Sequence, residues 1–147
     1  MSDMPQLADL SHRDLRQLLE YWQNLGTDGG LPLSESVDPS ELRRWLGHLV
    51  VIDVEPDGSF VYAYYGEGFE IAFGQNQIGR SVDELPAPQR HLIRTEYERV
   101  RDSGAPVARR YTADFEGQVQ TWERLVLPLS GDGETVEKLL VAAYRLS

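Results

Sequence analysis

Apolar residues recur at helical spacing near the start of the chain. Between Ser11 and Gly26 they occupy positions 15, 18, 19, 22 and 25, which lie on one face of an amphipathic helix. The Ser-x-x-Asp sequence that begins at Ser11 is typical of a helix N-terminus, and the glycines from Gly26 onward are expected to end the helix. We therefore predict a first amphipathic helix of about four turns.

The rest of the chain alternates between strand-like and helical segments. Five runs rich in Val, Ile, Leu and aromatic residues predict strands over residues 48–55, 60–65, 107–115, 120–129 and 135–146. A short helix is expected to begin at Asp38-Pro39, and short helical pieces and turns are expected over 66–88. Turn sequences such as Pro56-Asp57-Gly58-Ser59 join neighbouring strands as hairpins, so the sheet is predicted to be mainly antiparallel.

Two further patterns indicate which faces are buried. A longer helix over 89–102 is expected to turn Leu92, Ile93, Tyr97 and Val100 toward the core. The last strand is apolar on both faces, which is typical of a central strand covered on both sides. The helices between the strands can cover one side, and the N-terminal helix, alone or with a partner subunit, can cover the other.

The stretch FVYAYYGEGFEIAFGQNQIGR, from Phe60 to Arg80, contains a Gly-x-Gly pair after a strand. A dinucleotide-binding loop would need a third glycine where Ile71 stands, and its strand would belong to a parallel unit. We therefore interpret Gly66 and Gly68 as a sharp turn with positive φ. Phe69, Ile71 and Phe73 are then expected to pack toward the sheet.

Composition narrows the class of protein. The 147 residues, 41% of them hydrophobic, suit one domain with a sizeable core. A net charge of −10 argues against binding to nucleic acid or to anionic membranes. Without any cysteine the chain has no disulfide, thiol nucleophile or cysteine-ligated metal site. No secretory signal or membrane-spanning stretch is recognisable, so we expect a cytoplasmic protein.

Several short motifs occur along the chain in the following order: Tyr21-Trp22, Leu31-Pro32, Asp38-Pro39, Leu46, Tyr62 to Gly66, Phe73-Gly74, Ile78-Gly79-Arg80-Ser81, Leu85, Glu123-Arg124-Leu125 and Leu127-Pro128-Leu129-Ser130. Together with the order of the predicted elements, these motifs resemble a PAS-like domain family of alphaproteobacteria. The resemblance spans roughly residues 15–146. Glu67 departs from the pattern, because the family usually has a threonine after Gly66.

The resemblance implies an α+β fold with a PAS-like five-stranded antiparallel sheet. Helices would lie on one face, the first and last strands would be adjacent in the middle, and an N-terminal amphipathic helix would be added. Residues 1–14 would form a tail, and residues 15–147 a single domain that includes this helix. The family implies a sensory or regulatory module without naming a ligand. Photoadduct chemistry of the flavin or coumarate type needs a cysteine, so we expect no cofactor, although a non-covalent small molecule remains possible.

Candidate chemistry is limited. We expect no catalytic residues and no metal site, because the three histidines lie outside any recognisable motif. His91, at the start of the pocket-side helix, is the one histidine placed to contact a ligand. Arg109 and Arg124 lie in strands, where a buried guanidinium needs either an acidic partner or an anionic ligand. The other candidate ligand contacts are aromatic residues that alternatively fill the core: Tyr64, Phe69, Phe73, Tyr97 and Tyr111.

Three functions fit these features. The first is a non-enzymatic sensory or regulatory module that binds a small molecule, a protein partner or both, and signals through its N-terminal helix or its oligomeric state. Four residues of the N-terminal helix are expected either to form contacts in a homodimer or to cover the domain's own sheet: Leu15, Leu18, Leu19 and Trp22. The second is a pure protein-interaction module with a filled core. The third is a small enzyme resembling ketosteroid isomerase, with Asp53 or Asp114 as its general base.

Overall fold

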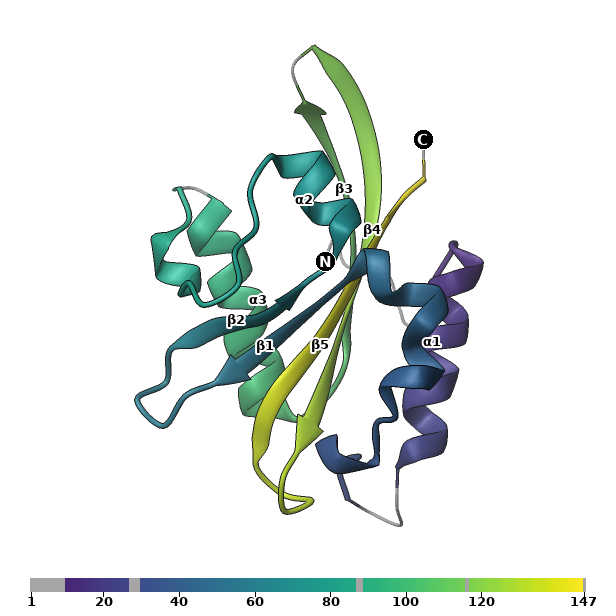
Figure 1. Ribbon diagram of the computed structural model, residues 1–147, viewed down its shortest axis with the longest axis vertical. Helices are drawn as coiled ribbons and strands as arrows, with labels where there is room; N and C mark the ends of the chain where they lie inside the picture. The colour runs from purple at the N-terminus through teal and green to yellow at the C-terminus, as the bar shows by residue number, and fades with distance from the viewer. Residues whose placement is uncertain (1–9, 27–29, 87–88, 116, 147) are drawn as a thin grey trace.

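The five strands form one antiparallel sheet in the order β2-β1-β5-β4-β3 (Figure 1). The protein is described from a computed structural model, over residues 10–26, 30–86, 89–115 and 117–146. The strands are β1 (Leu49–Val54), β2 (Phe60–Tyr65), β3 (Val107–Phe115), β4 (Gln118–Ser130) and β5 (Val136–Arg145). The first and last strands are adjacent in the middle of the sheet, as the PAS-like interpretation predicts.

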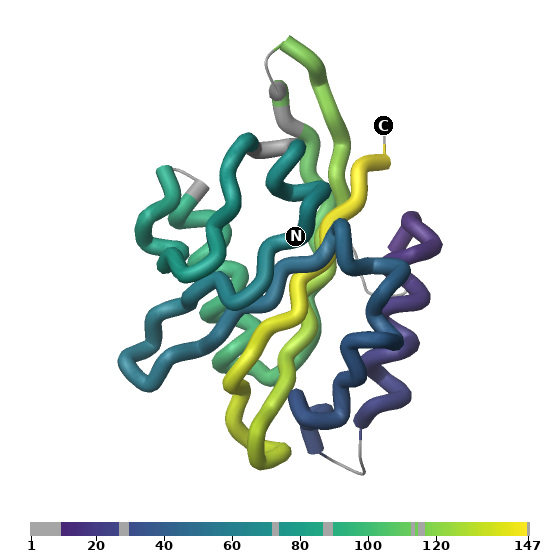
Figure 2. The backbone as a smooth tube through the Cα atoms, viewed as in Figure 1, coloured from purple at the N-terminus to yellow at the C-terminus, as the bar shows by residue number. Residues whose placement is uncertain are grey.

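Helices cover both faces of the sheet. On one side lie α1 (Arg13–Leu25) and the 3₁₀ helix η3 (Pro39–His48), and on the other lies α3 (Gln89–Ser103), as Figure 2 shows. The α3 side also receives α2 (Glu67–Phe73) through Phe69, and the short η4 (Val82–Glu84) through Val82. A further short 3₁₀ turn is η2 (Ser34–Ser36). Within the described segments, no helix is both long and apolar enough to cross a membrane.

The central strand β5 supplies both hydrophobic cores, as its sequence predicts. Leu139, Val141 and Ala143 belong to the core beneath α3. The alternate residues of β5, Leu140 and Ala142 among them, belong to the core beneath α1. Two-sided burial of one strand accounts for its apolar residues at both even and odd positions.

The N-terminal helix packs on its own sheet. Leu15, Leu18 and Leu19 are buried in the core beneath α1, so the structure gives them the second of the two roles that the sequence left open. The helix begins two residues earlier than the predicted domain boundary, and Leu10 is also buried. The cap is His12, whose Nδ1 accepts the backbone N–H of Asp14, and not Ser11.

A bulge in the β1–β2 pairing overturns one expectation about β2. Strict alternation places Tyr62 and Tyr64 on one face, but the register shifts between Val51 and Ile52. Tyr62 and Tyr65 therefore both lie in the core beneath α3, whereas Tyr64 faces α1. The Tyr64 hydroxyl donates to the carbonyl oxygen of Leu46 at 2.9 Å, so the predicted pocket role of Tyr64 on the α3 side is wrong.

The Gly66–Gly68 turn is tight for a reason other than the predicted positive φ. Gly66 has φ −64° and begins α2. A Cβ at Gly66 would lie 2.6 Å from the Leu46 carbonyl oxygen and 2.8 Å from that of Leu49, so the glycine is required by close backbone approach. Because the following segment is a helix, Phe69 is buried while Ile71 is 76% exposed, which corrects the expectation for Ile71.

Candidate functional site

A buried ionic cluster joins α3 to the sheet. Glu96 on α3 is 3% exposed, and its carboxylate receives two guanidinium groups. Arg124 on β4 donates to Oε1 through Nε at 3.0 Å and Nη2 at 2.8 Å, and Arg109 on β3 donates through Nε to Oε2 at 2.8 Å. The acidic partner that a buried Arg124 requires is therefore Glu96.

Strand pairing explains why the cluster needs an acid. Arg109 and Arg124 are directly opposite one another across the β3–β4 ladder. Like charges at such positions repel, and burial strengthens the repulsion. Glu96 shares the core-facing side of α3 with Ile93, Tyr97 and Val100, which places its carboxylate between the two arginines.

Electrostatics keep the three groups charged. Burial alone raises the pKa of Glu96, but the charges of Arg124 and Arg109 and their hydrogen bonds outweigh it and hold the pKa below the usual 4.5. Burial lowers the pKa of Arg124, and the charge of Glu96 more than offsets this, so the pKa of Arg124 is raised. An ionised, doubly paired Glu96 is a poor general acid or base at neutral pH.

Tyrosine side chains surround this cluster. The Tyr97 hydroxyl lies 3.3 Å from Nη2 of Arg124 and belongs to a side chain that is 1% exposed. Burial, together with the nearby Tyr97, raises the pKa of Tyr62 and brings that of Tyr65 to about 12, while the charge of Arg124 acts in the opposite direction on both. Arg109 also lies over the ring of Tyr111, with its guanidinium carbon 5.1 Å from the ring centre.

Several donors in the cluster have no partner. Within the described part of the chain, Arg109 makes hydrogen bonds only through Nε, and Arg124 only through Nε and Nη2. The hydroxyls of Tyr62 and Tyr65 have no hydrogen bond among the described residues either, although both side chains are more than nine-tenths buried. The side chains on this face therefore hold more hydrogen-bonding capacity than the protein itself uses.

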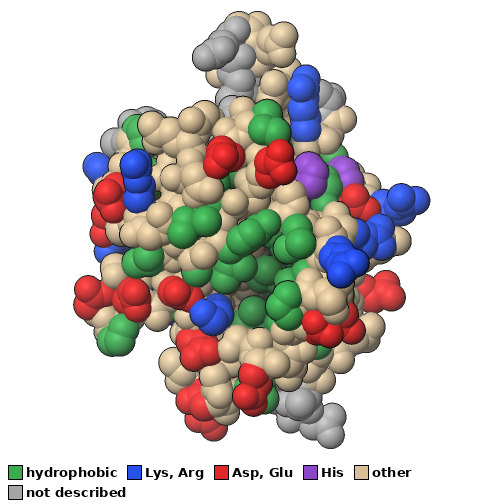
Figure 3. All heavy atoms as spheres, viewed as in Figure 1, with side chains coloured by type: hydrophobic (Ala, Val, Ile, Leu, Met, Phe, Trp, Pro, Cys, Tyr) green, Lys and Arg blue, Asp and Glu red, His purple; other side chains and the backbone are tan. Residues whose placement is uncertain are grey.

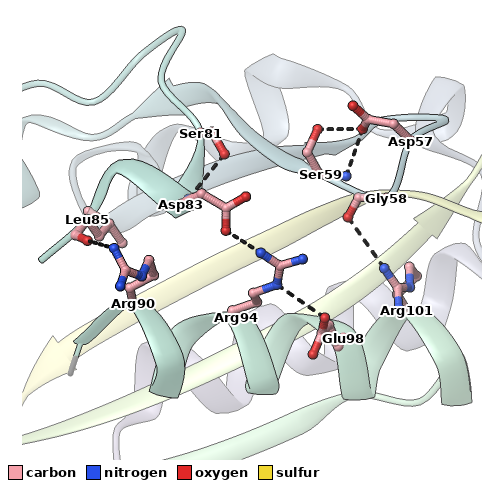
Figure 4. A network of polar contacts seen from close by, with 10 residues as sticks. All are labelled: Asp57, Gly58, Ser59, Ser81, Asp83, Leu85, Arg90, Arg94, Glu98 and Arg101. Carbon is pink, nitrogen blue, oxygen red and sulfur yellow. Dashed lines mark hydrogen bonds and ion pairs between the residues drawn. The ribbon is translucent and has the colours of Figure 1, made fainter. Parts of the chain in front are cut away.

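The opposite surface of α3 has a different kind of polar network. Figure 4 shows Arg90, Arg94 and Arg101 of α3 pointing toward the 81–85 segment and the β1–β2 hairpin. Arg94 pairs with Asp83 and, at 3.2 Å, with Glu98. Arg101 donates to the Gly58 carbonyl at 3.5 Å. These exposed contacts fix the position of α3 but enclose no buried polar group.

On the α1 side of the sheet, the residue next to Arg124 anchors the start of α1. Glu123 is fully buried, and its Oε1 accepts the backbone N–H of Ser11 at 3.0 Å and that of His12 at 2.8 Å. Arg110 donates to its Oε2 at 2.7 Å. A carboxylate from β4 therefore holds the backbone in place where α1 begins.

The predicted ligand contacts divide into three groups. Tyr97, Arg109, Tyr111 and Arg124 lie together around Glu96, and Phe69 contacts Tyr65 in the same core, with ring centres 5.6 Å apart. Tyr64 faces the other side, and His91 is exposed beside Leu92, which is 59% exposed, so the inward placement expected of both residues on α3 is wrong. The side chain of Phe73 lies outside the described residues.

Three members of the cluster were missed by sequence reasoning. Glu96 follows Ile93 by three residues and precedes Val100 by four, so helical spacing alone places it on the buried face. Tyr62 and Tyr65 gave no such signal, because only the bulge brings them onto one face.

The carboxylates considered for an enzyme are not placed for catalysis. Asp53 accepts from Nζ of Lys138 at 2.6 Å, and Asp114 is exposed and accepts from the backbone N–H of Gly117 at 2.7 Å. An ion pair with lysine at Asp53 and exposure to water at Asp114 differ from the apolar enclosure that a carboxylate general base of this type needs. Among the residues that the structure describes, no three His, Asp or Glu side chains gather in an arrangement that suits a metal ion.

Comparison with known proteins gives one family and several similar folds. Residues 10–143 match the family described as PAS domain. The curated proteins include no match to the sequence. The VqmA dimer of Vibrio cholerae has a similar fold, with a TM-score of 0.57 and 15% identity over 76% of this chain and 52% of the VqmA chain. The structure described as VqmA bound to DPO matches with a TM-score of 0.56 and 17% identity, over 73% of this chain and 56% of the VqmA chain.

A smaller sensor shows the same architecture over most of its length. The sensory box sensor histidine kinase of Vibrio cholerae matches with a TM-score of 0.51 and 18% identity, over 74% of this chain and 89% of the other. By contrast, the chain spans about half the length of the VqmA proteins. At these identities the similarity establishes the fold alone.

Proposed function

Because the chain belongs to the PAS domain family, we propose that it is a sensory or regulatory module that binds a small molecule between α3 and the sheet. The observation behind this proposal is the cluster around Glu96, where some arginine nitrogens and two tyrosine hydroxyls have no hydrogen-bond partner among the described residues. Among the described residues, the enclosed side-chain atoms that lack a partner are Gln17 Oε1 and the Tyr144 hydroxyl, so the free donors of this cluster are not sealed off and a ligand could reach them. VqmA, which has a similar fold, is described as bound to DPO, which supports a small molecule as the ligand class.

The signal is proposed to leave through α1. Arg124 lies on the face of β4 that would contact the ligand, and its neighbour Glu123, on the other face, binds the backbone at the start of α1. A shift of β4 that follows ligand binding would change both sets of contacts. The partner is then a protein that recognises α1, or a second copy of the chain. A cytoplasmic location and an alphaproteobacterial origin stay predictions.

Native mass spectrometry of protein purified gently from its own host tests this function. We expect a bound small molecule that is lost after unfolding and refolding. Removing it should accelerate hydrogen exchange of the amides over residues 11–16, because their anchor on Glu123 loosens. Protein that arrives without any bound compound, and whose exchange is the same before and after refolding, would contradict the proposal.

A protein-interaction module is the second candidate. The half-buried side chains of Val51 and Tyr64 lie at the margin of the core beneath α1. Figure 3 shows apolar side chains gathered in a hollow near the middle of one face, with charged side chains around them. Trp22 is also half-buried and remains the candidate for a dimer contact on α1. A mass that falls from dimer to monomer in Trp22→Glu, but not in Gln23→Glu, would support self-association.

A further inference from the structure

The cluster around Glu96 has an uncompensated positive charge. Two guanidinium groups, of Arg109 and Arg124, share one carboxylate, and the pKa directions found for Glu96 and Arg124 keep both of those groups ionised. The side chains of Arg124 and Arg109 are only 8% and 19% exposed, so water screens this charge poorly. The chain as a whole has a net charge of −10, so the excess is a local property of this site.

The unused donors lie near this charge. Nη1 of Arg124 and both terminal nitrogens of Arg109 have no partner among the described residues. The hydroxyls of Tyr62 and Tyr65 come from the neighbouring side of the same core, and the charge of Arg124 acts on the pKa of both. A planar fork of guanidinium N–H groups matches the two oxygens of a carboxylate.

The arginines on the outer surface of α3 provide a contrast within the same helix layer. Arg94 is balanced by two carboxylates (Figure 4), and Arg101 pairs with Asp102 at 2.9 Å. Arg94 and Arg101 therefore have one acid or more each, and Arg90 donates to the Leu85 carbonyl, whereas the two buried arginines share a single acid. If these arginines served structural pairing alone, the buried ones would be expected to have more acidic partners than the exposed ones, because burial makes an unbalanced charge more costly.

The charge count also limits the ligand. One excess positive charge is neutralised by one negative charge, and a dianion such as phosphate would leave the site negative.

We infer that the site takes a small monocarboxylate, whose oxygens accept from Arg109 and Arg124 and from the Tyr62 and Tyr65 hydroxyls. Its apolar body would lie against the surrounding rings, including Phe69 and Tyr111. Glu96 is a positioning residue that holds the two guanidinium groups at the ligand. This inference rests on the proposed function, because it names the ligand class for that same site.

Two isosteric probe pairs test the ligand class on refolded full-length protein: benzoate against benzamide, and acetate against acetamide. The members of each pair differ in charge but hardly in shape. We expect at least one acid to bind saturably by calorimetry, about tenfold or more tighter than its amide. Equal affinity of acid and amide, or no binding of either acid up to tens of millimolar, would overturn the inference.

Three variants test whether the acid binds at this site. Arg109→Gln, at the more exposed arginine, should weaken acid binding about tenfold and bring the acid and amide affinities together. Tyr62→Phe keeps the shape of the core and should weaken the acid several-fold, which provides a second test if Arg109→Gln does not fold. Arg94→Gln on the outer surface of α3 is the matched control and should bind as the wild type does. Acid binding that survives both Arg109→Gln and Tyr62→Phe would place the acid elsewhere.

The outcomes separate this inference from the proposed function. A neutral or cationic compound released from the native protein would leave the sensory function standing and reject the acid. A monocarboxylic acid of matching mass would support both. If the native protein contains no compound and none of the four probes binds, both proposals fall.

Discussion

Glu123 and Arg124 are consecutive residues on β4, yet each fixes a helix on a different face of the sheet. The Glu123 carboxylate accepts the backbone N–H of His12 at 2.8 Å, and Arg124 donates to Glu96 of α3 at 2.8 Å. Alternation of side chains along a strand makes such neighbours point to opposite faces. The shortest physical connection between the proposed ligand site and α1 is therefore one peptide unit.

Replacing Glu123 with Gln should loosen α1. The amide would lose the charge that Arg110 meets and would place an N–H₂ group near backbone donors, so the free energy of unfolding should fall by about 2 kcal/mol. Urea denaturation measures this loss, and hydrogen exchange should show it first at residues 11–16. Asp14→Asn removes an exposed ion pair with Arg44 near the same helix start and should cost less than about 0.5 kcal/mol. Equal losses in the two variants would contradict the anchoring role.

The stabilising effect of Glu96 should depend on pH in a defined direction. Its pKa in the folded protein is lowered below 4.5, so its contribution is fully present above that pH and is lost as the pH falls through the folded-state value. Glu96→Gln should be markedly less stable than the wild type near pH 7, with a difference that shrinks as the pH falls below 4.5 and through the folded-state pKa of Glu96. Urea midpoints across this range measure the difference.

Glu98→Gln on the same helix is the control for this pH series. Its partner Arg94 is exposed, so the variant should differ little from the wild type at any pH. A difference between Glu96→Gln and the wild type that does not shrink at any acidic pH at which both proteins remain folded would show that Glu96 contributes through shape and not through its charge.

Patterns that depend on regular geometry could be predicted from the sequence. β2 was expected over residues 60–65 and has those bounds, because the turn at Pro56-Asp57-Gly58-Ser59 fixes the hairpin. The two-faced apolar pattern of β5 placed it at the centre of the sheet. Both conclusions follow from side-chain period and turn chemistry, which are local properties.

Features that depend on irregular or distant contacts could not be predicted in this way. The bulge in β1–β2 exchanges the faces of Tyr64 and Tyr65, and the sequence contains no period that reveals it. On α3, Leu92 looks like a core residue, but Ile93, Tyr97 and Val100 face the sheet together with Glu96 and leave Leu92 exposed. The apolar spacing of α3 does not by itself reveal which of two adjacent residues, Leu92 or Ile93, lies in the core.

A pair of tyrosine variants tests the bulge. Tyr64→Phe removes the hydrogen bond to the Leu46 carbonyl and should lower the free energy of unfolding by about 1 kcal/mol. Tyr62→Phe removes a hydroxyl that has no partner among the described residues and should change the stability of the ligand-free protein by much less. Chemical denaturation of both refolded variants measures the two effects. The reverse order would mean that β2 follows strict alternation.

The final prediction concerns the glycine that begins α2. A methyl group at position 66 would meet the backbone oxygens of Leu46, Gly47 and Leu49 at 2.6–2.8 Å, and backbone atoms cannot rotate away as a side chain can. Gly66→Ala should therefore lower the free energy of unfolding by about 2–3 kcal/mol. Thermal and urea unfolding measure the loss.

Gly47→Ala is the matched control, because a Cβ at Gly47 has no neighbour within 4 Å. This change should leave stability unaltered or raise it by up to about 1 kcal/mol through lower entropy of the unfolded chain. A tolerated Gly66→Ala would mean that η3 and α2 are farther apart than the structure places them. A large loss confined to Gly66→Ala would instead show that this glycine is needed for close packing against η3 and β1.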